Sequence, residues 1–359
     1  MKASPAVMHS DWEISFSTML QGLACPRSVA FDKTTELRSL LTSPSLAGVM
    51  GSCAHVLLSR FAPHSLPERD FESAWKDEVD RAALRLEGPG LGSVPAPESW
   101  PGYWLTYTRT KSRLVGSDPP RLPPAAEHRE RSADLQRGGG LPLVEKRLRD
   151  LERHITGTPD LVYRDAEGAL CILDYKTGTR VSPERESAQL HLYAHLVQLE
   201  TGERPQFGEI DRLRGQTERQ RLADSRIKNE VTRAMEVRRV VLEPEPEGAA
   251  SAEACRKCPY RLVCSRSLVA TDEPQAGDLV GRVQDVFHHS SGHPAAVSIT
   301  TDHNSVVLGG LESRQMNILP GMALLVMGAR GAVGGHGLLA DWSTVVVTDY
   351  QINVSTSPD

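Results

Sequence analysis

The clearest hydrophobic pattern lies near the middle of the chain. Residues 157–163 and 169–176 are two short apolar runs separated by the polar segment 164–168, and this pattern predicts two strands joined by a hairpin turn. Residues 183–201 then carry apolar side chains at helical spacing over a broad face, which predicts a helix. Strand, turn, strand and helix in this order indicate the centre of an α/β domain.

Helical patterns dominate the part of the chain before this unit. Residues 11–60 are expected to be largely helical, and residues 70–87 repeat apolar side chains every three to four positions, as another helix would. Residues 115–140 are rich in Gly, Pro and unpatterned charge, which predicts a mobile insertion. A short apolar run over 141–145 suits a strand, and residues 219–239 suit a further helix.

The pattern changes after residue 275. Charged residues become fewer, and short alternating apolar runs are separated by glycines. Evenly spaced short strands of this kind predict a small β-barrel, for which an OB-like barrel is the expected type. We therefore expect two domains, residues 1–270 and residues 275–359.

The composition narrows the class of protein. The chain of 359 residues is 39% hydrophobic and 24% charged, as in an ordinary globular protein. No apolar run approaches the ~20 residues of a membrane span, and the first residues lack the apolar core of a signal peptide, so no membrane association and a cytoplasmic location are expected. The net charge of −5 excludes a protein that is basic throughout. Two basic tracks, 109–149 and 212–239, fit either local nucleic-acid contacts or solvated helix faces.

Two acids and a lysine stand on the two predicted central strands. Asp160 and Asp174 lie on either side of the predicted turn, so strand pairing would bring them together. Lys176 follows Asp174 by two positions and therefore lies on the same face of its strand. Mg²⁺ prefers oxygen ligands and needs only one or two carboxylates. A lysine beside it could orient a water molecule and offset charge that develops on a phosphate.

These residues resemble the core of the PD-(D/E)XK nuclease superfamily, with Pro159-Asp160 as the "PD" and Asp174-x-Lys176 as the "(D/E)xK". Its RecB-like branch is the most similar, because Gly157 lies three positions before the first acid and Leu173-Asp-Tyr-Lys-Thr-Gly178 surrounds the second. That branch also carries Gln-x-x-x-Tyr on the next helix, here Gln189 and Tyr193, which share one helix face and would lie near the DNA and the lysine.

The resemblance implies a fold and further site residues. The fold would be a restriction-endonuclease-like α/β core, in which a mixed central sheet is flanked by helices. Family members carry a histidine on an N-terminal helix that completes the metal site, and His55 in Gly51-Ser-Cys-Ala-His55 fits its position. Glu145 fits an additional acid, as a weaker match. The implied activity is Mg²⁺- or Mn²⁺-dependent hydrolysis of DNA, with Asp160 and Asp174 among the metal ligands.

Three cysteines are spaced as Cys255-x2-Cys258-x5-Cys264. Six cysteines in a cytosolic protein are poor evidence for disulfides. Three of them lie within ten residues, which points to a metal or cluster instead. A fourth ligand is needed for tetrahedral Zn²⁺ or for a cubane cluster, and Cys25 is the best candidate. The arrangement is similar to that of the iron–sulfur nucleases of the RecB-like branch, such as the AddB-type domain and the nucleases of CRISPR adaptation. It implies a [4Fe–4S] cluster, with Zn²⁺ as the alternative.

Several functions fit these features. The leading one is a DNase, an exonuclease or end-processing enzyme of DNA repair, recombination or defence against foreign DNA. No Walker A motif is present, so a helicase or other DNA-processing partner would be a separate chain. A second possibility is a catalytically silent nuclease-fold scaffold or DNA-binding subunit of such a complex. A third is a zinc-ribbon binding protein.

Overall fold

The computed structural model describes most of the chain. It covers residues 9–43, 45–61, 66–86, 94–115, 141–178, 182–213, 217–249, 251–267, 277–302, 304–312, 314, 316–332, 337–341 and 343–348. The insertion expected at 115–140 lies almost entirely outside the described residues, because only residue 115 is among them.

The N-terminal part is helical, as its apolar spacing predicts. It contains α1 (Phe16–Ala24), α2 (Pro26–Asp32), α3 (Thr35–Leu41), α4 (Leu46–Phe61), α5 (Glu68–Leu86), the short 3₁₀ helix η1 (Pro97–Ser99) and α6 (Tyr103–Val115). Ser15 caps α1 by accepting a hydrogen bond from the Thr18 amide, which satisfies a donor that the first turn leaves open. In the described part of the chain, no helix is long and apolar enough to cross a membrane.

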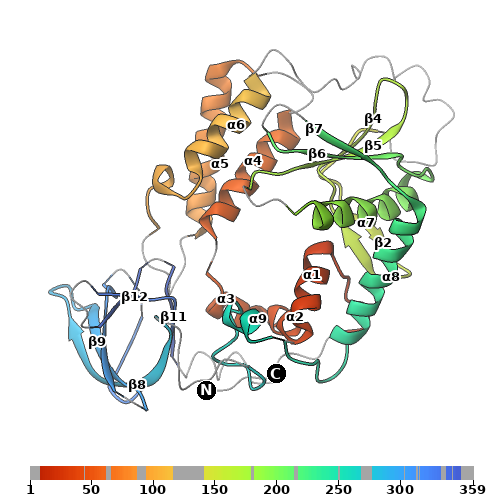
Figure 1. Ribbon diagram of the computed structural model, residues 1–359. Coiled ribbons are helices and arrows are strands. Elements are labelled where there is room, and N and C mark those ends of the chain that lie inside the picture. The colour runs from red at the N-terminus through yellow and green to blue at the C-terminus, as the bar shows by residue number, and fades with distance from the viewer. Residues whose placement is uncertain are drawn as a thin grey trace.

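A five-stranded mixed sheet forms the centre of the larger region (Figure 1). Its strands are β1 (Leu143–Val144), β4 (Leu161–Arg164), β5 (Leu170–Tyr175), β6 (Phe207–Asp211) and β7 (Thr217–Arg221), in the order β1-β4-β5-β6-β7. Among the described strands of this sheet, only β5 and β6 pair in parallel, and α7 (Pro183–Thr201) connects them. A two-stranded ribbon of β2 (Leu148–Asp150) and β3 (Ile155–Gly157) stands beside this sheet.

Two element boundaries differ from the sequence expectation. The single strand expected at 157–163 is divided, because β3 ends at Gly157 and β4 begins at Leu161. Pro159 lies in the gap and has no amide hydrogen to continue a ladder. The helix expected at 219–239 is shorter at its start, since β7 occupies residues up to Arg221 and α8 runs over Asp224–Val241.

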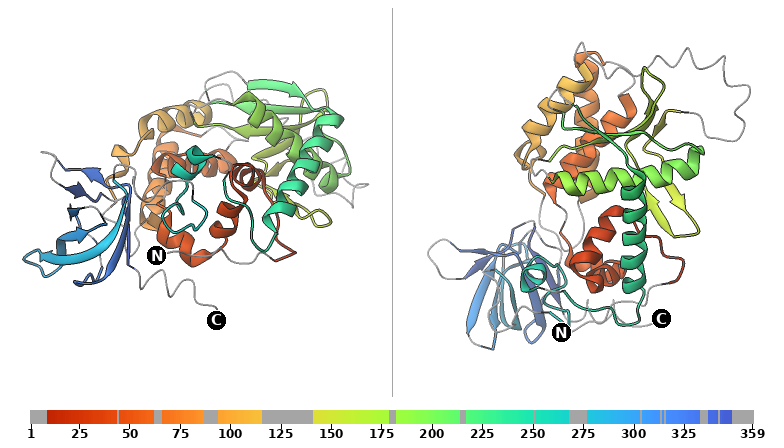
Figure 2. Two further views of the ribbon diagram at one scale, coloured as in Figure 1. Left: turned by 60° about the horizontal axis from the view of Figure 1, so that its bottom comes forward. Right: turned by 45° about the vertical axis from the view of Figure 1, so that its right-hand side comes forward.

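Helices cover both faces of the central sheet. Val162, Ile172 and Leu170 belong to a core shared with α1, α7 and α8. Leu161 and Leu173 alternate with them and pack against α4, α5 and α6 on the opposite face. This alternation follows from the two-residue period of a strand. The right-hand view of Figure 2 shows the central sheet between these two groups of helices.

The C-terminal region is a separate curled sheet. It contains β8 (Leu279–His288), β9 (Pro294–Thr300), β10 (Ser305–Gly309), β11 (Ala323–Met327), β12 (Arg330–Gly331), β13 (Leu338–Leu339) and β14 (Val345–Thr348), in the order β12-β13-β10-β9-β8-β11-β14. The barrel-like character expected from the sequence is therefore present as a half-barrel. The described residues form seven strands in this sheet, whereas an OB fold has five.

The curled sheet packs against the helical segment that holds the cysteines (Figures 1 and 2). Leu325, Met327, Val345 and Val347 of this sheet share one buried cluster with residues of α2, α3 and the segment after α9 (Ala252–Arg256). The Arg261 guanidinium also donates two hydrogen bonds to the Asp278 carboxylate, at 2.6 and 2.8 Å. The segment that follows α9 is thus the joint between the two regions.

Candidate active site and cysteine cavity

Three acids stand side by side at the ends of three neighbouring strands. The register pairs Leu161 with Leu173, so its continuation by one residue places Asp160 opposite Asp174. The pairing of Val144 with Leu161 likewise places Glu145 opposite Asp160, and the Glu145 amide donates to the Asp160 carbonyl at 3.0 Å. Strand pairing alone therefore sets Glu145, Asp160 and Asp174 in one row.

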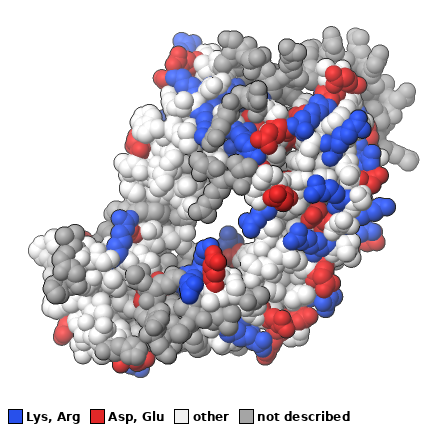
Figure 3. All heavy atoms as spheres, viewed as in Figure 1, with Lys and Arg blue, Asp and Glu red and all other residues white. Residues whose placement is uncertain are grey.

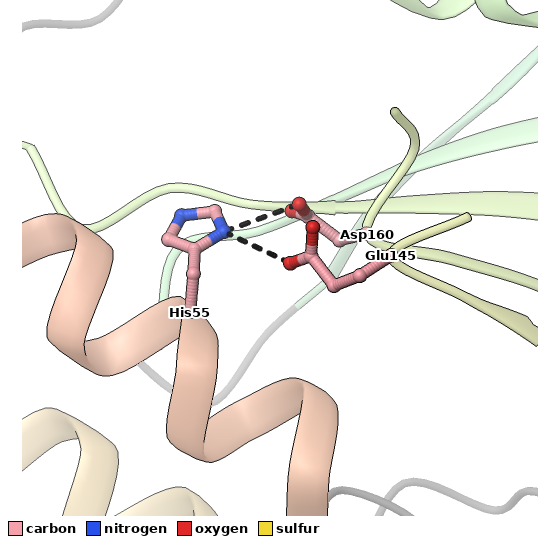
Figure 4. Close-up of side chains that lie close together, drawn as sticks. All are labelled: His55, Glu145 and Asp160. Atoms are coloured by element: carbon pink, nitrogen blue, oxygen red, sulfur yellow. Dashed lines mark hydrogen bonds and ion pairs between the residues drawn. The ribbon is translucent and has the colours of Figure 1, made fainter. Parts of the chain in front are cut away.

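His55 reaches this row from α4 (Figure 4). Its Nδ1 lies 3.1 Å from Asp160 Oδ1 and 3.9 Å from Glu145 Oε1. The ring of Tyr175 meets the imidazole edge-on, at 6.2 Å between centroids, and helps to fix its orientation. The other oxygen of Asp160 accepts a hydrogen bond from the Tyr175 amide at 2.5 Å, so the carboxylate is held from two sides.

Lys176 links the row of acids to α7. Its Nζ lies 2.6 Å from Asp174 Oδ2 and donates a hydrogen bond to Gln189 Oε1 at 2.8 Å. The Gln189 amide in turn donates to the Tyr193 hydroxyl at 2.9 Å. The four-residue spacing of Gln189 and Tyr193 places both on one face of α7. The four residues form one continuous chain of contacts, Asp174–Lys176–Gln189–Tyr193.

Two glycines allow the helices to approach the site closely. A Cβ atom on Gly157 would lie 2.7 Å from the Tyr193 ring and 2.9 Å from Leu196, so a larger residue there would push α7 away. A Cβ atom on Gly51 would lie 2.9 Å from the Thr177 hydroxyl, at the point where α4 passes the segment after Lys176. The glycine of the sequence motif thus has a packing role beside the site.

Burial and crowding of negative charge shift the site pKa values. Burial raises the pKa of Glu145 to about 7, and the Asp160 charge adds to this rise. Burial likewise raises the pKa of Asp174 to about 6; Lys176 opposes the shift and Asp160 reinforces it. For His55, burial lowers the pKa, but the hydrogen bond and charge of Asp160 outweigh it and leave a net rise. A bound cation would relieve this crowding of carboxylates.

The acids and the histidine fit a divalent metal ion. His55, Glu145 and Asp160 are the set of such side chains, among the described residues, whose ligand atoms all lie within 4.8 Å of one another. Carboxylate oxygens suit Mg²⁺ or Mn²⁺, whereas an imidazole nitrogen is more typical of a transition-metal ligand. Asp174 stands next to Asp160 in the row but turns an oxygen toward Lys176.

Arg109, Arg113 and Asp211 also contact the site, and the motifs alone do not single them out. The Asp211 carbonyl accepts from the Lys176 amide at 2.8 Å, while its carboxylate pairs with Arg113 at 2.9 Å. Arg109 donates to the Thr177 carbonyl at 3.2 Å. The first basic track contains both arginines, and this was the only sequence signal for them. Together they anchor α6 to the segment that carries Lys176.

The four cysteines line one cavity at the other end of the helical region. Cys25 lies between α1 and α2, Cys255 lies on α9, and Cys258 and Cys264 follow in the turns after it. The Cys258 amide donates to the Cys255 carbonyl at 3.0 Å, and the Cys264 amide donates to the Tyr260 carbonyl at 2.8 Å. These local turns bring the three later cysteines together, and α2 adds Cys25 across roughly 230 residues of sequence.

The cavity holds its thiols in an apolar setting. Burial raises the pKa of Cys258 to about 12, with smaller effects of the other three thiols. Burial is also the largest influence on the raised pKa of Cys25. No three of the four sulfur atoms lie within 4.8 Å of one another in the described structure. By contrast, Cys53 and Cys171 are buried away from this cavity, in α4 and β5.

Comparison with known proteins identifies the family of the chain. No curated protein matches the chain. Among solved structures, a crystal structure of a protein designated SSO0001 is similar, with 12% sequence identity and a TM-score of 0.32, over 74% of this chain and 90% of that chain. The model of the PD-(D/E)XK nuclease superfamily matches residues 13–265, which include the row of acids, Lys176 and all four cysteines. The chain therefore belongs to the PD-(D/E)XK nuclease superfamily.

Proposed function

We propose that this protein is a Mg²⁺- or Mn²⁺-dependent deoxyribonuclease that hydrolyses phosphodiester bonds at DNA ends. The observation that carries the proposal is the row of Glu145, Asp160 and Asp174, with His55 at one side and Lys176 at the other. Members of this superfamily are typically hydrolytic nucleases, and each residue type that such hydrolysis requires is present here.

The side chains of the site would have three roles: metal binding, orientation of the attacking water and positioning of the lysine. His55, Glu145, Asp160 and Asp174 would hold the metal ion, which when bound supplies positive charge to a phosphate oxygen and acidity to a water molecule. Lys176 would orient the attacking water and offset the negative charge that grows on the phosphate. Gln189 holds the Lys176 ammonium in place through its side-chain oxygen, and Tyr193 holds Gln189.

The charge distribution supports a nucleic-acid substrate, and the resemblance to DNA-cleaving nucleases favours DNA. In Figure 3, Lys and Arg side chains gather over the larger region, interleaved with acids, while the curled sheet shows few of them on this face. Local basic tracks of this kind bind a phosphate backbone even when the net charge is negative. Similarity to the RecB-like branch favours action at DNA ends in repair, recombination or defence, beside a separate helicase or other DNA-processing chain.

For the second site, we propose a [4Fe–4S] cluster held by Cys25, Cys255, Cys258 and Cys264. A single zinc ion with Zn–S bonds of ~2.3 Å would draw four sulfurs to about 4 Å from one another. Four thiolates around one cavity supply the ligand number for either group, and the resemblance to the iron–sulfur nucleases favours the cluster. The cluster would join α2 to the segment after α9 and so close the helical region.

The first experiment measures cleavage by anaerobically purified protein. Single- and double-stranded DNA, with free or blocked ends, is incubated with Mg²⁺, with Mn²⁺ or with chelator. We expect metal-dependent degradation that requires a free end and is lost in Lys176→Ala. The control is Lys76→Ala, because Lys76 pairs with Asp80 on the exposed face of α5 and lies outside both basic tracks. Equal cleavage by Lys176→Ala and wild type would exclude the mechanism.

The same experiment distinguishes the alternative functions. A protein that binds DNA but cleaves neither free nor blocked substrate with either metal would be a nuclease-fold scaffold. The absorbance spectrum tests the second site independently. A cluster gives a brown protein that absorbs near ~400 nm, whereas zinc gives no such band. Metal analysis that finds four irons per chain, or one zinc, decides between the two occupants.

A further inference from the structure

Arg27 is a buried arginine on the wall of the cysteine cavity. It lies on α2, two residues after Cys25, and is only 5% exposed. Its Nη2 donates to the Ser265 hydroxyl at 3.2 Å, and its guanidinium carbon lies 5.7 Å from the centre of the Phe31 ring. Its buried Nε has no hydrogen-bond partner in the part of the chain that the structure describes. Among the described residues, no carboxylate lies within ion-pair distance of this guanidinium.

A buried cation in such a setting is unfavourable unless something balances it. Transfer of an isolated charge from water into a protein interior costs several kcal/mol, and one neutral hydroxyl with an aromatic ring offsets only part of this. Buried arginines are therefore normally paired with an anion. The other lining groups that the structure describes are thiols, serine hydroxyls, apolar atoms and two further arginines. None of them supplies a carboxylate, so the occupant of the cavity is the remaining source of negative charge.

The two other arginines that line the cavity are already engaged. Arg261 makes its two hydrogen bonds to Asp278 at the joint with the curled sheet. Arg266 is 46% exposed and pairs with Glu245 at 3.0 Å, so solvent and a carboxylate both screen its charge. Arg27 differs from both because it combines deep burial with the lack of an acidic partner.

We propose that Arg27 is the counter-ion of an anionic metal–thiolate group in this cavity and that it stabilises the group's more negative, reduced state. The proposal rests on the cysteine site proposed above. Four thiolates around a [4Fe–4S] core carry net negative charge, and one-electron reduction adds one more. A fixed, poorly screened cation favours the state of greater negative charge more strongly. Arg27 thus adjusts how readily the occupant accepts an electron.

The test is an anaerobic reductive titration of the complete chain with dithionite and a redox mediator, followed by absorbance. Arg27→Met removes the charge and keeps an apolar stem. At a fixed potential near the wild-type midpoint, we expect its ratio of oxidised to reduced cluster to rise at least tenfold, which corresponds to 59 mV for one electron. Arg266→Met is the matched control, and its ratio should change less than twofold. An unchanged ratio in Arg27→Met overturns the proposal.

A second measurement separates a counter-ion from a merely structural residue. The thermal unfolding midpoint is recorded for wild type and Arg27→Met, each with its metal group and after removal of the group by a chelator. We expect the variant to be less stable than wild type when loaded but equally or more stable when stripped, because the stripped wild type keeps an unbalanced buried charge. Equal destabilisation in both states would mean that Arg27 acts through packing alone.

The remaining outcomes are also decisive. If Arg27→Met fails to fold, Arg27→Lys is tested in its place. The proposal is supported if this variant retains iron and its ratio of oxidised to reduced cluster stays within threefold of the wild-type ratio. A folded Arg27→Lys protein without iron overturns the proposal. A wild-type protein that holds neither iron nor zinc would refute the cysteine site itself, and Arg27 with it. If the metal content is intact but substitution of Arg27 leaves the ratio of oxidised to reduced cluster unchanged, only the counter-ion role of Arg27 is refuted.

Discussion

The two candidate metal sites are assembled in opposite ways. The row of acids comes from neighbouring strands, and the pairing that forms the sheet also aligns Asp160 with Asp174. The cysteine cavity instead joins the chain's first helices to a segment roughly 230 residues later. In the first site, the fold positions ligands that it would bring together anyway. In the second, an occupant bound by the four thiols would hold together parts of the chain that lie far apart in sequence.

This difference separates chemistry from stability. Removal of a ligand from the row of acids should cost activity and leave the fold in place, because β4 and β5 are paired by their own backbone. Removal of a cysteine should lower the stability of the fold. The bond from that cysteine to the occupant closes a long loop of the chain, and this cross-link reduces the entropy of the unfolded chain. The predictions below test this separation, from the largest expected effect to the smallest.

Asp160→Asn should give the largest loss. The asparagine side chain keeps an oxygen that can accept a hydrogen bond from the Tyr175 backbone N–H, so the strand ends should remain in register. The negative charge beside His55 and Glu145, however, is lost. We expect DNA cleavage to fall on the order of 10³-fold, which is several kcal/mol of lost transition-state stabilisation. Initial rates in saturating Mg²⁺ measure this loss. Asp224→Asn, at the exposed start of α8, should cleave normally, and a change in iron or zinc content of Asp160→Asn would break the proposed separation.

Cys25→Ser should give the largest loss of stability. Loss of a cross-link over this loop costs on the order of 4 kcal/mol, so the thermal midpoint should fall by roughly 10 °C. Differential scanning calorimetry of the loaded proteins measures the shift, and the two stripped proteins should melt alike. Cys171→Ser removes a buried thiol outside the cavity and should keep the metal content. A loaded Cys25→Ser protein with an unchanged midpoint would contradict the stapling role.

His55→Ala should weaken metal binding with a smaller effect on the fully loaded enzyme. The substitution removes the one nitrogen ligand near Asp160 and Glu145. We expect the Mg²⁺ concentration for half-maximal cleavage to rise roughly ten- to a hundredfold. A Mg²⁺ titration of the cleavage rate gives this value, with His289→Ala in the curled sheet as the control. Unchanged Mg²⁺ dependence would remove His55 from the ligand set.

Tyr193→Phe should have the smallest effect. It removes only the hydroxyl that accepts from Gln189, while the ring keeps its packing against Gly157. One such hydrogen bond contributes about 0.5–1.5 kcal/mol, so cleavage should slow roughly two- to tenfold. Gln189→Ala, which removes the direct contact to Lys176, should slow it more. The reverse order of the two variants would show that Tyr193 acts on the substrate and not through Gln189.

The sequence predicted the elements around the first site because local patterns determine them. The helix expected at 183–201 is α7 with the same bounds, and the turn after Arg164 forms around Gly168, whose φ of +82° suits glycine. Strand register could be extended from this turn, and so Asp160 and Asp174 were expected to meet. The position of His55 came only from the family resemblance, since α4 reaches the row through tertiary packing.

Other features depend on contacts that sequence patterns do not contain. Helix α6 carries its three aromatic residues within its first five positions, and its apolar face is explained only by α4 and α5, against which it packs. The parallel strand β6 is fixed by its pairing with β5. The unusual setting of Arg27 could not be predicted, because burial without a carboxylate partner is a property of the folded cavity.

The joint beside the cysteine cavity also bears on how the chain folds during synthesis. Cys25 leaves the ribosome roughly 230 residues before Cys255, which at ~5–20 residues per second is an interval of roughly 10 to 50 s. Helices α1 and α2 bury Met19 and Val29 against residues of α8, which are also made late. The curled sheet, which is made after these residues, packs on Tyr260 and Val263. The apolar faces of α1 and α2 would therefore stay exposed until α8 is made. A chaperone that prevents aggregation through these faces would matter most during this interval.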